Sequence, residues 1–125
     1  GVDLSKENTD IVYEENKEIK DQILFYNGDS ADFDQISTYI NTHLDGKIDM
    51  LLIDGWHSVN QVLKEWRFIN YLSKEGCVLL HDTNNHPGPK ELLAALDENI
   101  FKIEQPFLGR YDDWGIACVS FKRDD

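Results

Sequence analysis

The sequence is poor in basic residues and has no long apolar run. Its 12 lysine and arginine residues stand against 24 aspartate and glutamate residues, which gives a formal net charge of -12 over 125 residues. Because phosphate backbones and anionic membranes are bound through lysine and arginine, we expect neither a nucleic acid nor a membrane as partner. No apolar run approaches the roughly 20 residues that span a bilayer, and the first residues do not have the pattern of a signal segment.

Cysteine is also scarce. Cys77 and Cys118 each lie inside an apolar run, without the CxxC spacing of redox or zinc motifs. A free cysteine in such a run behaves as a small hydrophobic residue. We therefore expect two reduced thiols rather than a disulfide, and a cytoplasmic location.

Several motifs of well-known enzyme classes are missing, namely the P-loop, the GxGxxG loop and the nucleophile elbow. What the sequence does contain is an alternation of strand-like apolar runs and helical patterns. Ile48–Ile53 and Cys77–Leu80 are typical of strands covered on both faces, and an amphipathic helix is expected between them from Val59 to Leu72, ended by Gly76. The alternation predicts one α/β domain over residues 1–125, a three-layer Rossmann-like sandwich with a mostly parallel sheet.

The remaining elements are shorter. Helical spacing predicts helices over residues 8–16, 33–44 and 91–96, the last separated from the preceding strand by Pro87-Gly88-Pro89. Val2–Leu4 is expected to be the end of a strand, and Ile23–Tyr26 a short strand. Phe101–Phe107 and Gly115–Phe121 predict a final antiparallel strand pair.

Four of the expected strands end on or just before an aspartate: Asp3, Asp29, Asp54 and Asp82. Parallel strands joined by helices end at one edge of a sheet, where open α/β sheets bind ligands. Each aspartate alone could instead cap the helix or loop that follows it. Four carboxylates at one edge repel one another unless a cation or a donor-rich ligand lies among them, and both interpretations stay open for each residue.

Histidines accompany the third and fourth of these aspartates. Asp54, His57, His81, Asp82 and His86 form a plausible oxygen and nitrogen ligand set for a divalent ion. Carboxylates favour magnesium, calcium or manganese, whereas imidazoles move the preference toward iron, nickel or zinc. Alternatively, His57 caps the helix that follows it, and His86 is a plain loop residue.

Two segments point to a known family: Ile53-Asp54-Gly55-Trp56-His57-Ser58 and Glu75-Gly76-Cys77-Val78-Leu79-Leu80-His81-Asp82. Together with Asp3 and Asp29, they resemble the class I S-adenosylmethionine-dependent methyltransferases. Within this class, the resemblance is to the methyltransferase-24 or cephalosporin-hydroxylase-like group. The resemblance extends from Gly1 to Lys122. It implies S-adenosylmethionine as cofactor and methyl transfer to a hydroxyl of a small molecule or sugar.

The resemblance also implies roles for single residues. Asp3, with Leu4 beside it, would bind the ribose hydroxyls of the cofactor, Asp29 would meet the adenine amino group, and Ser30 would lie against the adenine ring.

In related metal-dependent members an acidic pair follows the fifth strand. By resemblance, Asp54 and Asp82 would hold a magnesium ion that orients the acceptor hydroxyl, with His81 as a further ligand. His57 would be the general base.

One part of the family pattern lies outside these residues. The first strand of the family and its glycine-rich loop would precede Gly1, so we expect an N-terminally truncated domain. Such a sheet lacks a central strand between the strand ending at Asp3 and the strand ending at Asp54. Its open edges could be covered by a partner chain or by a second copy of this chain.

Two other functions remain open from the sequence. The aspartate and histidine cluster could serve a metal-dependent hydrolase that activates water. A truncated domain could also persist without catalysis, as an interaction module. The acceptor substrate cannot be read from the sequence, because loops set specificity in this fold.

Overall fold

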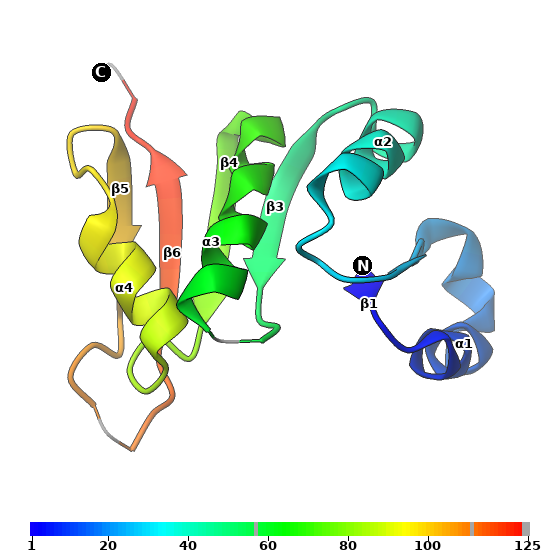
Figure 1. The fold of residues 1–125 in the computed structure, drawn as a ribbon, viewed down its shortest axis with the longest axis horizontal. Coiled ribbons are helices and arrows are strands. Elements are labelled where there is room, and N and C mark those ends of the chain that lie inside the picture. Colours follow the sequence, from blue (N-terminus) through cyan, green and yellow to red (C-terminus); the bar gives the residue numbers. More distant parts are fainter. Residues whose placement is uncertain (57, 111, 124–125) are drawn as a thin grey trace.

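The computed structural model describes residues 1–56, 58–110 and 112–123 of the chain. Its described strands form a sheet of two and a sheet of four, the latter in the order β3-β4-β6-β5 (Figure 1). The strands are β1 (Val2–Asp3), β2 (Tyr26–Asn27), β3 (Ile48–Ile53), β4 (Leu72–His81), β5 (Phe101–Glu104) and β6 (Ile116–Phe121).

Most of the strand pairing is as predicted. β1 pairs with β2 in parallel, and β3 pairs with β4 in parallel. β6 runs antiparallel to both β4 and β5. The predicted α/β class and the antiparallel pair at the end of the chain are therefore confirmed.

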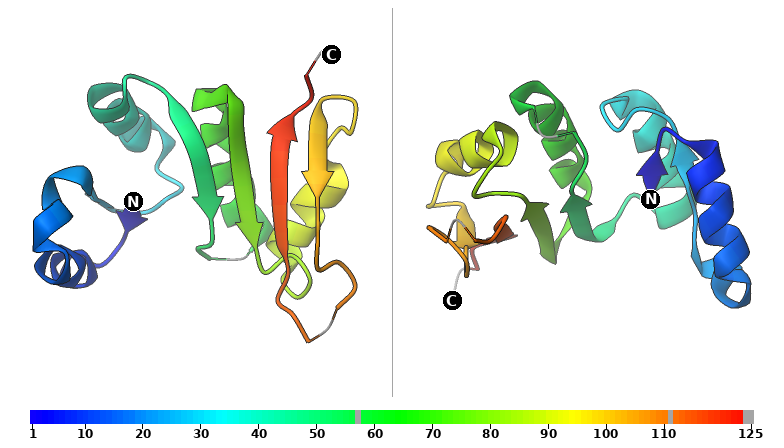
Figure 2. Two further views of the ribbon diagram at one scale, coloured as in Figure 1. Left: turned by 180° about the vertical axis from the view of Figure 1, so that it is seen from behind. Right: turned by 90° about the horizontal axis from the view of Figure 1, so that it is seen from below.

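Helices α3 and α4 lie on one face of the four-stranded sheet, as Figure 2 shows from behind and from below. The described helices are α1 (Lys6–Glu15), α2 (Phe33–Leu44), α3 (Val59–Trp66) and α4 (Pro87–Ala95), with short 3-10 helices at Lys17–Gln22 and Arg67–Tyr71. Among the described residues, the model contains no helix long and apolar enough to cross a membrane.

The main core lies between the four-stranded sheet and helices α3 and α4. Val78 and Leu80 of β4 are fully buried and face these helices, as expected for alternate residues of a strand. They pack with Val62 of α3 and Leu92 of α4. Burial of these side chains fixes α3 and α4 on this face of the sheet.

A second, smaller cluster joins the two sheets. Ile36 and Ile40 of α2 pack with Phe68 from the 3-10 helix that follows α3. Phe33 stacks on Phe68 with ring centroids 5.3 Å apart, and the Arg67 guanidinium lies 4.0 Å from the Phe33 centroid. The unit built on β1 and β2 is therefore held to the larger sheet through its helix α2.

The apolar run of β3 was expected to be covered on both faces, and the described residues do not provide this cover. Met50 and Leu52 are 57% and 56% exposed. They alternate with Leu51 and Ile53, which contribute to the clusters under the helices. In addition, β1 and β3 are not hydrogen-bonded neighbours in the described part of the chain, so each leaves one strand edge unpaired.

Several predicted boundaries were wrong, and β5 ends at Glu104 rather than at Phe107. β2 is Tyr26–Asn27 rather than residues 23–26, and α4 begins at Pro87, which suits the first helical turn because its missing N–H would have no partner there. The helix from Val59 ends at Trp66, and β4 already begins at Leu72, which is paired with Ile48.

Gly76 is therefore a strand residue and not a helix cap. It is buried, and a Cβ atom at this position would lie 2.8 Å from the Asp49 carbonyl oxygen. Glycine is required here because the backbones of β3 and β4 approach closely beside the register irregularity between Ile48 and Met50.

We predict that Gly76→Ala lowers the free energy of unfolding by about 1–3 kcal/mol, because the added methyl group overpacks this contact. Urea unfolding followed by circular dichroism measures the change. Lys74→Ala, an exposed position of the same strand, is the control and should change stability by less than about 0.5 kcal/mol. Equal stability of both variants would contradict the close approach.

Candidate functional site

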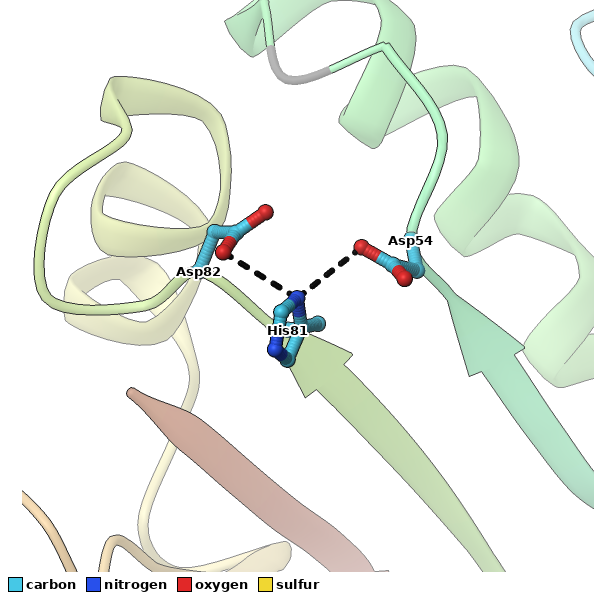
Figure 3. A group of neighbouring side chains, drawn as sticks. All are labelled: Asp54, His81 and Asp82. Atoms are coloured by element: carbon cyan, nitrogen blue, oxygen red, sulfur yellow. Dashed lines mark hydrogen bonds and ion pairs between the residues drawn. The ribbon is translucent and has the colours of Figure 1, made fainter. Parts of the chain in front are cut away.

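Three side chains meet where β3 and β4 end (Figure 3). The Nδ1 atom of His81 lies 3.1 Å from Asp54 Oδ1 and 3.1 Å from Asp82 Oδ1. One potential ligand atom of each residue lies within 4.8 Å of the others. The structure thus brings together three of the five candidate ligands, the three that the family resemblance implied.

The cluster follows from the strand pairing. Ile53 is paired with Leu80, so Asp54 and His81 leave adjacent parallel strands at the same level. Asp82 adopts a left-handed backbone with φ of 62°. Its N–H donates to the Gly115 carbonyl at 2.9 Å, and its carbonyl accepts from the His86 N–H at 3.1 Å. These bonds hold the turn that directs the Asp82 side chain back toward His81.

The chemistry of the donor set suits a divalent cation. A single imidazole Nδ1 carries at most one hydrogen and cannot direct it at two carboxylates, whereas its lone pair and two carboxylates can all face one cation. Asp54, His81 and Asp82 would supply two carboxylate oxygens and one imidazole nitrogen to such an ion. Asp54 and His81 are 44% and 41% exposed at their side chains, so the cluster is accessible to a ligand.

The other two histidines have different outcomes. His86 precedes α4 and its ring stacks on Trp114, with centroids 6.0 Å apart and planes at 11°. Within the described residues it does not belong to the potential metal group, so this candidate ligand is not supported. His57, the expected general base, lies outside the described residues.

Asp3 acts as a local cap. Its Oδ1 accepts a hydrogen bond from the Ser5 N–H at 2.7 Å, and Ser5 in turn caps α1 through the Asn8 N–H. The capping interpretation is thus correct for one oxygen of Asp3. Leu4 is 78% exposed beside it.

The loop after β2 holds the second part of the site. Asp29 Oδ1 accepts from the Ala31 N–H at 2.8 Å and from Gln61 Nε2 at 3.1 Å. The hydrogen bond from Ala31, and after it the one from Gln61, lower the pKa of Asp29 below its ordinary value. Ser30 Oγ lies 2.5 Å from Glu65 Oε2 and accepts from Gln61 Nε2 at 2.8 Å.

Sequence reasoning did not find Gln61 and Glu65. A signal for Glu65 was present, because its position falls on the apolar face formed by Val62, Trp66 and Ile69, where a carboxylate needs a partner. Nothing comparable distinguished Gln61. The pattern could have indicated a buried acid, but not the loop that it contacts.

Asn84 organises the loop between β5 and β6. Its Nδ2 atom lies 2.8 Å from the Phe107 carbonyl, 3.1 Å from that of Arg110 and 3.2 Å from that of Asp113. Its backbone N–H donates to the Trp114 carbonyl. This loop therefore closes against the turn after Asp82. A cleft of about 720 Å³ borders the same turn, with Thr83 in its lining.

The comparisons with known proteins concern the fold. No protein-family model and no curated protein matches the chain. Among solved structures, a protein of Clostridium thermocellum assigned as an rRNA methylase is similar over 98% of this chain and 74% of its own, at 12% identity with a TM-score of 0.69.

A TDP-rhamnose 3'-O-methyltransferase of calicheamicin biosynthesis is similar over the whole chain at 17% identity, with a TM-score of 0.65. This chain spans 57% of the length of that protein. Both likenesses confirm the predicted Rossmann-like fold.

We predict that Asn84→Ala speeds amide hydrogen exchange in residues 107–110, because the loop loses side-chain hydrogen bonds worth about 1 kcal/mol each. Hydrogen–deuterium exchange with mass spectrometry measures the effect. Asn85→Ala, an exposed neighbour, serves as the control and should leave this exchange unchanged. If Asn84→Ala also left it unchanged, Asn84 would not organise the loop.

Proposed function

We propose that these residues form the larger part of an S-adenosylmethionine-dependent methyltransferase domain of the methyltransferase-24 or cephalosporin-hydroxylase-like group. The reaction is methyl transfer to a hydroxyl of a small molecule or sugar. The observation that carries the proposal is the cluster of Asp54, His81 and Asp82 at the carboxyl edge of a sheet whose fold resembles two methyltransferases.

In this proposal the cofactor lies across the ends of β1 and β2. S-adenosylmethionine supplies an electrophilic methyl group. Asp3, with Leu4 beside it, binds the ribose hydroxyls, and Asp29 accepts from the exocyclic amino group of adenine, with Ser30 close to the ring. An ionised carboxylate can only accept hydrogen bonds, and the lowered pKa of Asp29 suits this role.

Asp54, His81 and Asp82 would hold a magnesium ion. A divalent ion lowers the pKa of a bound hydroxyl and fixes its line of approach to a methyl donor. Two carboxylates match its charge, and the imidazole adds a neutral ligand. The role of His57 as general base, which would accept the proton of the acceptor hydroxyl, stays a prediction.

The cleft beside Thr83 supports a small acceptor. Leu93 and Leu96 on the α4 side and Ile103 of β5 provide apolar lining, while Lys90 and Gln105 provide polar groups. Such a mixture suits a sugar or a hydroxylated small molecule. Thr83 in its lining directly follows Asp82, which we place at the acceptor hydroxyl.

We further propose that a parallel strand fills the space between β1 and β3 in the active form. Crossovers between parallel strands are right-handed. A crossover that moves toward one edge of the sheet therefore places its helix on one face, and a crossover that moves toward the other edge places its helix on the opposite face. The connection from β3 to β4 carries α3 on one face (Figure 2). A strand in the gap that leads to β1 would therefore carry its helix on the opposite face, the face on which Met50 and Leu52 are exposed.

The metal-dependent hydrolase receives less support. Two-metal hydrolytic sites need more ligands than the three residues that come together among the described residues. It would also leave Asp3 and Asp29 without a role at the same edge.

We predict that the protein binds Mn²⁺ as a magnesium surrogate and that Asp54→Asn and Asp82→Asn each weaken binding at least about tenfold, the effect of about 1.4 kcal/mol. Each variant removes one anionic ligand. Electron paramagnetic resonance measures free Mn²⁺ in a titration. The control is Asp49→Asn, an exposed residue of β3, which should bind Mn²⁺ as the wild type does. Unchanged affinity in the first two variants would exclude this metal site.

We predict that Asp3→Ala abolishes S-adenosylmethionine binding, because the ribose loses its charged acceptor. Isothermal titration measures S-adenosylmethionine binding by the wild type and by Asp3→Ala. Each is tested as residues 1–125 and as a longer polypeptide that supplies the additional strand. Asp10→Ala, on the exposed part of α1, is the control. If the wild type bound no S-adenosylmethionine in either length, the result would contradict the proposed function and favour the interaction module.

A further inference from the structure

Two side chains of α3 extend to the loop after β2, in the other sheet. Gln61 Nε2 lies 2.8 Å from Ser30 Oγ and 3.1 Å from Asp29 Oδ1, and Ser30 Oγ lies 2.5 Å from Glu65 Oε2. Glu65 is only 7% exposed, whereas Asp29 is exposed. A buried carboxylate at the end of such a chain of hydrogen bonds is unusual and needs a reason.

The donors and acceptors define one direction for these hydrogen bonds. The Gln61 amide donates to both Asp29 and Ser30, since the carboxylate of Asp29 can only accept. Ser30 then accepts from Gln61 and donates its single hydrogen to Glu65. The hydroxyl of Ser30 therefore makes both of these hydrogen bonds to α3. Asp29 is the exposed acceptor of the network.

Glu65 also lies beside the turn that follows β3. A Cβ atom on Gly55 would lie 3.2 Å from Glu65 Oε2, the same oxygen that accepts from Ser30. Gly55 follows Asp54 of the metal cluster directly. One buried oxygen therefore lies between the loop of Asp29 and the turn of Asp54, although these belong to sheets that are not hydrogen-bonded to each other.

We propose that Gln61 and Glu65 are positioning residues, which set the separation between the Asp29 loop and the Asp54 turn and aim Asp29 at its ligand. The inference deepens the proposed function, on which it rests for the identity of that ligand as a base with an exocyclic amino group. Neither residue touches the reacting atoms.

The first test needs no ligand. Carbon-13 carboxyl NMR of residues 1–125 follows the titration of Asp29 in the wild type, in Gln61→Ala and in the control Asn60→Ala, an exposed neighbour on α3. Loss of the Gln61 hydrogen bond should raise the pKa of Asp29 toward its ordinary value, and Asn60→Ala should leave it unchanged. An unchanged pKa in Gln61→Ala would overturn the role of Gln61.

The second test concerns Glu65. Glu65→Gln keeps the size of the side chain and the fold, and amide NMR then reports on both neighbours. The resonances of Ser30 and Gly55 should shift together, because the same Glu65 oxygen accepts from Ser30 and lies beside Gly55. A shift of only one of them, or of neither, would overturn the link between the two halves of the site.

The third test separates this inference from the proposed function. Isothermal titration compares S-adenosylhomocysteine with its inosine analogue, which presents an acceptor in place of the amino group. The longer polypeptide with the additional strand is used. The wild type and Asn60→Ala should prefer the adenine form, and Gln61→Ala should lose at least about tenfold of this preference.

The outcomes are distinct. If neither ligand binds the wild type while the NMR results are as expected, the proposed function fails and the positioning network stands. If binding is normal and the preference survives in Gln61→Ala, the proposed function stands and the aiming of Asp29 is overturned.

Discussion

Parallel hydrogen bonding between β3 and β4 determines where the candidate site lies. The register that places Ile53 opposite Leu80 delivers Asp54 and His81 side by side, and the left-handed turn at Asp82 returns a second carboxylate to the same point. A shift of one residue would send His81 to the helix-covered face, because side chains alternate along a strand. Burial of Val78 and Leu80 under α3 and α4 opposes such a shift. The cluster of Asp54, His81 and Asp82 is therefore fixed by the core, which lies on the opposite face of β4.

Much of this arrangement could be predicted from the sequence, because its signals are local. Apolar runs that end on Asp54 and on His81-Asp82, with a helical pattern between them, imply a right-handed parallel unit and hence adjacent strand ends. The weaker elements were harder. β1 and β2 are two residues long each, so their bounds depend on the pairing of Tyr26 with Val2 rather than on any pattern in the sequence.

The parts that could not be predicted depend on contacts between distant segments. Gly76 appeared to end a helix, yet it is required by the approach of two backbones. Glu65 was not found from the sequence, and its partner Ser30 is 35 residues away. Likewise, the run of β3 is that of a strand covered on both sides, and the exposure of Met50 and Leu52 could only be seen in the folded molecule.

The separation into two sheets divides the molecule at a natural split point. A strand inserted there would pair with both sheets at once, and it would bury two edges in a single step. The 125 residues and a separate strand peptide could then act as complementary fragments. Such fragments can be used to report on assembly, because the recovery of a continuous sheet would coincide with their association.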